Sequence, residues 1–79
     1  MSMAEEIVGA IISDGKAKLR TGLVSETIEH FSASLALNEV EKDPISFSLI
    51  SVAYANILTE LELLKRANDV LETALNRLN

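Results

Sequence analysis

The segment Pro44–Thr59 reads PISFSLISVAYANILT and contains no charged residue, in a chain of which 24% is Asp, Glu, Lys or Arg. Such a stretch is typical of the central helix of a compact bundle, or of a surface that another protein covers. It is too short for a membrane span, which needs about 20 mostly apolar residues, and it contains several polar side chains. We therefore expect no membrane span. We expect the segment to act through packing rather than through catalytic chemistry.

Two apolar stripes run along this segment on different faces of a helix. The first consists of Phe47, Ile50, Tyr54, Ile57 and Leu61, and the second contains Leu49, Val52, Ala53 and Leu58. Because a surface helix needs only one stripe, the helix is either central and contacted on two sides, or it offers one stripe to the core and one to another chain. We favour the second alternative for so small a chain. The predicted partner-binding residues are those of the first stripe.

The composition predicts an all-α protein that forms a single helical domain over residues 1–79. The chain has one proline, three glycines and 48% hydrophobic residues. Changes in the phase of the apolar pattern predict helices at about 3–20, 24–40, 44–58 and 60–78. The expected architecture is a small antiparallel bundle of three to four helices, in which the last two either merge into one long helix or separate.

Local signals set these predicted boundaries. Ser2 with Glu5 forms a capping box, Gly22 suits the left-handed end of a helix, and Asp43-Pro44 suits a helix start. For the last two helices we favour a break near Leu58–Thr59, because Thr59 with Glu62 reads as a capping box and Leu58 with Leu63 as a hydrophobic staple. The expected buried face of the last helix alternates large and small residues: Leu64, Ala67, Leu71, Ala74 and Leu78.

Two sets of residues in the chain repeat one spacing with a shift of 40 positions. The sets are Gly15, Gly22, Thr27, Phe31 and Ser34 in the first half, and Ala55, Glu62, Ala67, Leu71 and Ala74 in the second. The order of small, turn, small, large and small residues resembles the tetratricopeptide repeat, although Glu62 replaces the turn glycine and the family's period is about 34 residues. The resemblance implies two stacked αα-hairpins, with the large residue filling the gap between them.

No motif for catalysis, a cofactor or a metal is present. The only histidine, His30, has no candidate nucleophile or orienting group beside it, and there is no cysteine. The net charge of −5 argues against nucleic acid, since phosphate binding needs clustered Lys and Arg. We therefore expect no enzyme activity, no cofactor, no metal and no nucleic-acid partner. The lack of cysteine favours a cytoplasmic location.

The expected function is that of a small acidic helical module for protein–protein interaction, an adaptor or regulatory subunit that self-associates through the uncharged helix at 44–59. One alternative is an obligate homo-oligomeric structural bundle, a dimer or a higher oligomer. A second is a secretion-type co-chaperone that covers an apolar client helix.

Overall fold

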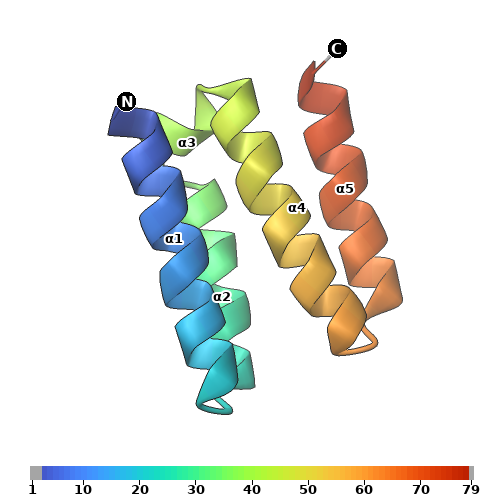
Figure 1. Cartoon of the computed structure of the whole chain (residues 1–79). Helices are drawn as coiled ribbons and strands as arrows, with labels where there is room; N and C mark the ends of the chain where they lie inside the picture. Colours follow the sequence, from blue (N-terminus) through green and yellow to red (C-terminus); the bar gives the residue numbers. More distant parts are fainter. Residues whose placement is uncertain (1–2, 79) are drawn as a thin grey trace.

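The computed structural model describes residues 3–78, and all regular structure in that range is helical. The helices are α1 (Met3–Arg20), α2 (Val24–Leu35), α3 (Asn38–Glu41), α4 (Pro44–Glu60) and α5 (Leu64–Leu78). Helices α1 and α2 form one antiparallel hairpin, α4 and α5 form another, and the short α3 joins them (Figure 1). The all-α class is confirmed, but the predicted count of three to four helices falls short of the five in the described range. The capping box predicted at Ser2 lies outside the described residues.

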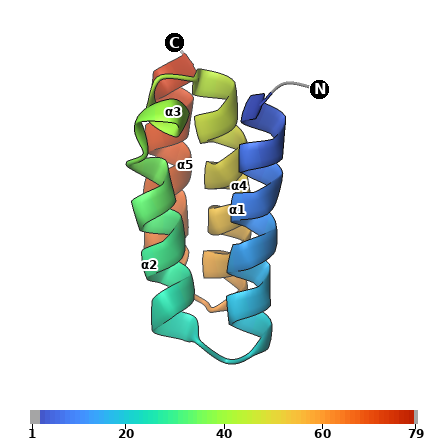
Figure 2. The ribbon, with the colours of Figure 1, turned by 90° about the vertical axis from the view of Figure 1, so that its left-hand side faces the viewer.

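The four long helices lie in two layers. Helices α1 and α4 form one layer, and α2 and α5 form the other (Figures 1 and 2). Helix α4 packs against α1, α2 and α5, so the uncharged segment is the central helix of the fold. This central position explains why the buried faces of the segment carry no charge, because a charge buried without a partner is strongly unfavourable.

Helix α2 is shorter than the predicted helix at 24–40. It ends at Leu35, and the chain is extended at Leu37, with φ −65° and ψ 136°, before α3 begins at Asn38. This change of direction buries Val40, while α3 as a whole packs against α2 and α4. The prediction of one helix over 24–40 was wrong. The apolar periodicity of that segment does not show that the chain must change direction to bury Val40.

The start of α4 follows the predicted Asp43-Pro44 signal. The Asp43 carboxylate accepts hydrogen bonds from the backbone N–H of Ile45 at 3.2 Å and from the Ser46 hydroxyl at 2.7 Å. Pro44 lies in the first turn, where a helix has no partner for the N–H that proline lacks. The side chain of Asp43 thus supplies an acceptor that the backbone alone cannot provide.

Helices α4 and α5 are separate, as favoured, but the break lies later than predicted. Thr59 is inside α4, where its hydroxyl donates to the Ala55 carbonyl at 2.8 Å instead of capping a new helix. The Leu63 N–H donates to the Leu58 carbonyl at 2.8 Å, a bond that closes the end of a helix. The residues interpreted as a helix start therefore form a helix end.

An aromatic contact joins the two hairpins at the centre of the core. The Phe31 ring is fully buried and stacks on Tyr54, with ring centroids 5.3 Å apart. Gly15 allows α1 to approach α2 at this level, since a Cβ atom there would collide with the Phe31 ring. His30, next to Phe31, donates from Nε2 to the Ile11 carbonyl at 2.8 Å and so ties α2 to α1.

Candidate interaction surface

The residues predicted to bind a partner do not form an exposed surface in the fold. Four of the five side chains are buried in the core and the fifth is half-buried: Phe47, Ile50, Tyr54 and Ile57, and then Leu61. Tyr54 faces α2, where its hydroxyl lies 3.1 Å from that of Ser32. The first stripe of α4 therefore packs in the core, and the side chains accessible to a partner lie on other faces of the molecule.

The opposite side of α4 carries an apolar stripe that the fold leaves open. Ile45, Leu49 and Val52 follow one another at helical spacing and are 68%, 51% and 48% exposed. The expectation of two stripes matches the fold only in part, since Leu49 and Val52 of the stripe assigned to the core are exposed, whereas Leu58 of the same stripe is fully buried.

Helix α5 also exposes a stripe that was expected to be buried. Its small residues Ala67 and Ala74 are buried, whereas the leucines of the predicted buried face lie outside: Leu64, Leu71 and Leu78, together with Leu75. The expectation failed because alanine allows the backbones of α4 and α5 to approach, which leaves the larger leucines at the side of the contact. We call the combined set the outer face: Ile45, Leu49, Val52, Leu64, Leu71, Leu75 and Leu78.

The turns of the two hairpins have the same backbone hydrogen bonds. At the first turn the Leu23 N–H donates to the Lys18 carbonyl at 3.0 Å, which matches the bond from Leu63 to Leu58 at 2.8 Å in the second turn. Gly22 and Glu62 occupy the equivalent positions in these turns, with φ of 81° and 63°. Positions 40 residues apart therefore play the same backbone role in the two turns.

The same shift relates two residues of the outer face, Leu71 and Leu75, to residues of the first hairpin that α4 covers. Phe31, whose equivalent is Leu71, is 0% exposed, whereas Leu71 is 43% exposed. Leu35, the equivalent of Leu75, is half-buried and packs against the core. Helix α4 lies on the first hairpin and covers these positions, and no described segment lies on the second hairpin in the same way.

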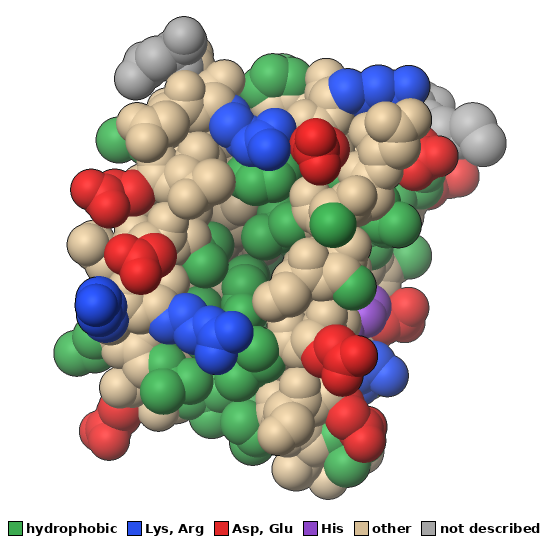
Figure 3. Space-filling view, turned by 180° about the vertical axis from the view of Figure 1, so that it is seen from behind, with side chains coloured by type: hydrophobic (Ala, Val, Ile, Leu, Met, Phe, Trp, Pro, Cys, Tyr) green, Lys and Arg blue, Asp and Glu red, His purple; other side chains and the backbone are tan. Residues whose placement is uncertain are grey.

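A groove of about 410 Å³ runs between α2 and α5 on the far side of the molecule (Figure 3). Figure 3 shows hydrophobic side chains along the hollow between the two helices, with charged groups at its edges. Nine residues from three helices line it: Ser32, Leu35, Phe47, Ser51, Tyr54, Arg66, Asp69, Val70 and Thr73. Sequence analysis missed this groove because no single helix contains it.

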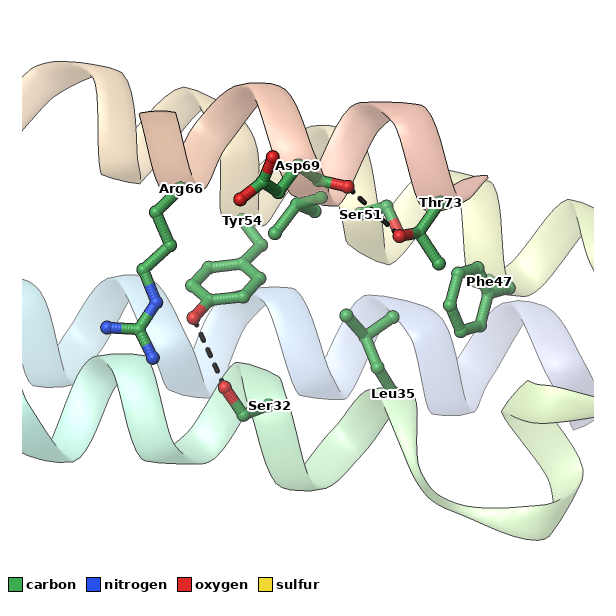
Figure 4. Close-up of a pocket in the computed structure, with 9 residues that line it drawn as sticks. Ser32, Leu35, Phe47, Ser51, Tyr54, Arg66, Asp69 and Thr73 are labelled. Carbon is green, nitrogen blue, oxygen red and sulfur yellow. Dashed lines mark hydrogen bonds between the residues drawn. The ribbon is translucent and has the colours of Figure 1, made fainter. Parts of the chain in front are cut away.

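The floor of the groove is apolar, and its rim carries one charge of each sign. Phe47 and Tyr54 lie on the floor, while the Arg66 side chain extends from α5 beside Tyr54 (Figure 4). The hydroxyl of Ser51 is buried there and has no hydrogen-bond partner among the described residues. An apolar side chain fits such a floor, and a polar atom that reached Ser51 would satisfy its hydroxyl.

Arg77 fastens the end of α5 to the rest of the bundle. Its guanidinium donates from Nη1 to the Glu41 carbonyl at 3.0 Å and lies 4.1 Å from the centre of the Phe47 ring. The cation–π contact and the hydrogen bond join α5 to α3 and α4, which holds one end of the second hairpin in place.

The described residues contain no group of three or more His, Cys, Asp and Glu side chains that could hold a metal ion. Among the same residues, no helix is long and apolar enough to cross a membrane. No family model, no curated protein and no solved structure matches this chain. The tetratricopeptide resemblance accordingly stays a prediction.

Proposed function

We propose that this protein is a small acidic helical module for protein–protein interaction, and that a partner docks on its outer face. Its role is binding rather than catalysis. Its location is the cytoplasm, because a chain without cysteine has no disulfide that a reducing environment would break. The proposal keeps the expected function and moves the docking surface from the core stripe of α4 to the opposite side of the same hairpin.

The observation that supports the proposal most directly is the exposure of seven large apolar side chains on one hairpin, each between 43% and 68% exposed. Single exposed leucines are ordinary, but contiguous apolar surface is typical of sites that another molecule covers. Each Å² of this surface that leaves water stabilises a complex by about 25 cal/mol before the costs of association. Docking on the outer face would therefore remove several large apolar side chains from water at once.

Photo-crosslinking tests the proposal at single positions. A photoreactive amino acid replaces Leu75 in one variant and Leu37 in a control, since Leu37 is 44% exposed but lies between α2 and α3, away from the second hairpin. We expect a discrete adduct with a protein, either another species or a second copy, from position 75 alone. Equal adducts from both positions, or none from position 75, would contradict the proposal.

The co-chaperone alternative is favoured by one feature, the groove with its apolar floor between α2 and α5. A client helix that inserts side chains into this groove would pass close to Thr73, an exposed residue of its rim. A photoreactive group at position 73 should then react with the client. An adduct from position 73 without one from position 75 would favour this alternative over docking on the outer face.

A further inference from the structure

We infer that the outer face binds a second copy of this chain, hairpin against hairpin, with the two α5 helices antiparallel. The inference rests on the proposed function, because it names the partner for the same surface. Four observations carry it: the way the first hairpin is covered, the self-complementary α5 stripe, the charges beside that stripe, and the spacing within it.

The first hairpin provides the precedent for what covers such a face. Phe31 is buried because an apolar helix of this chain, α4, lies across α1 and α2 and places Tyr54 on its ring. Leu71 occupies the equivalent position 40 residues later, with 43% of its surface exposed. Leu71 and Leu75 of the outer face are thus equivalent to residues that an apolar helix covers inside the chain, and the chemistry that fits them is an apolar helical surface.

The outer face can supply that surface to a copy of itself. A two-fold contact requires a patch that matches itself after rotation. A two-fold axis in the plane of contact, perpendicular to the helices and level with the first half of α5, sets the two α5 helices against each other. With the axis beside Asn68, Leu64 of each copy faces Leu71 and Leu75 of its partner, whereas Ile45 and Leu49, near the other end of the hairpin, lie outside the contact.

The charges beside the α5 stripe select the antiparallel orientation. Lys65 and Glu72 are both exposed and stand seven residues apart, so they lie on the same edge of the stripe. With the axis beside Asn68, about midway between the two residues, antiparallel helices set Lys65 of each copy near Glu72 of its partner. Parallel helices would align like charges. Two opposite pairs at the contact offset the general repulsion between chains of net charge −5.

The α5 stripe also has the spacing of a helix–helix seam. Its residues alternate steps of four and three: Leu64, Asn68, Leu71, Leu75 and Leu78. Asn68 is the only polar member. A polar residue at one position of such a seam lowers stability while it restricts the register. Replacing Asn68 by leucine should therefore strengthen association if this seam is the contact.

The size of the surface suits a dimer. A standard specific interface takes about 800 Å² from each partner. That area is roughly a sixth of the 5121 Å² that one chain exposes, which is a plausible share for one side of a slab measuring 31 × 24 × 17 Å between Cα atoms. Exposed leucines of α5 supply its apolar centre: Leu64, Leu71 and Leu75.

Sedimentation velocity over a hundredfold dilution tests the inference with a matched set of variants. Wild type should move from dimer to monomer, and the double variant Leu71→Glu, Leu75→Glu should stay monomeric, with a dissociation constant raised at least about a hundredfold. The control Leu37→Glu introduces the same charge at a similarly exposed leucine outside the outer face and should dimerise as wild type does. Helical circular dichroism should be retained in all three, since each substituted side chain is already exposed.

Two results of this experiment would overturn the second-copy inference. One is a wild-type chain that stays at the 8.6 kDa of a monomer throughout. The other is an equal loss of dimer in the double variant and in Leu37→Glu. If either occurs while position 75 still crosslinks to a different protein, the proposed function stands and only the identity of the partner is wrong.

Charge exchange tests the orientation. Lys65→Glu and Glu72→Lys should each raise the dissociation constant by about three- to tenfold at low salt, because each change affects both symmetric pairs. The double variant K65E/E72K should recover the wild-type value, and Asn68→Leu should lower it. Failure of the double variant to recover would overturn the antiparallel arrangement, and an unchanged dissociation constant in Asn68→Leu would remove α5 from the contact.

Discussion

The two hairpins differ in how far they bury a large apolar residue at equivalent positions, Phe31 in the first and Leu71 in the second. In the first, the large residue at position 31 is enclosed between Gly15 of its own hairpin and Tyr54 of the next. In the second, Leu71 has Ala67 and Ala74 buried beside it on the same helix but remains open itself. The turns that precede these residues have matching hydrogen bonds, so the difference does not arise from the local backbone.

This contrast shows that, in a stack of hairpins, the large apolar residues of one hairpin are buried only when a further helix packs on it. A hairpin buries the small residues where its two helices cross, but it cannot cover its own outward side. The first hairpin is completed by α4, and the second is completed by no described segment. The exposure of Leu71, where its equivalent Phe31 is buried, is therefore a consequence of position in the stack.

The largest expected effect contrasts Phe31→Ala with Leu71→Ala. Truncating the buried Phe31 should lower the free energy of unfolding by about 3–5 kcal/mol, because it removes an aromatic side chain and leaves a cavity. Leu71→Ala should lower it by less than about 1 kcal/mol under monomeric conditions, since much of Leu71 is exposed. Urea denaturation of dilute samples measures both, and similar losses would show that the hairpins are equally covered.

The next contrast is between two glycines of α1. Gly15→Ala should destabilise the fold by about 1–2 kcal/mol, because its Cβ atom would displace the Phe31 ring. The free energy lost by that displacement exceeds the gain from the higher helix propensity of alanine. Gly9→Ala should stabilise by about 0.5–1 kcal/mol, since the added carbon meets nothing within 4 Å beyond its chain neighbours and the nearby backbone of its own helix. Thermal melts of the two variants should shift in opposite directions. A stabilising Gly15→Ala would mean that the hairpin crossing is looser than the structure has it.

The smallest contrast compares the two turns. Both equivalent positions have positive φ, but one is glycine and the other is glutamate. Gly22→Ala should destabilise by about 1 kcal/mol, and Glu62→Gly should stabilise by up to about the same amount, because glycine adopts this conformation without Cβ strain. Equal denaturation midpoints for Glu62→Gly and wild type would show that the glutamate side chain offsets the strain of its backbone.

Local chemistry made much of the fold predictable from sequence. The start of α4 follows from Asp43 and Pro44, whose side chains act on the nearest backbone groups. The end of α1 near Gly22 is equally local. The end of α2 was not predictable from nearby residues, because it depends on the burial of Val40 against other helices. The Thr59–Glu62 pattern was misread because one short sequence is compatible with a helix start and with a helix end.

The sequence by itself determined that this chain is helical, that its central helix has two apolar stripes, and that its halves share a spacing. Periodicity and turn residues encode these properties within a few neighbouring positions. Only the tertiary structure decided which stripe is buried, that Ala67 and Ala74 rather than the leucines meet α4, and that a groove forms between α2 and α5. Those outcomes depend on which helices lie beside one another, and periodicity gives the direction of a side chain on its helix but not the identity of its neighbour.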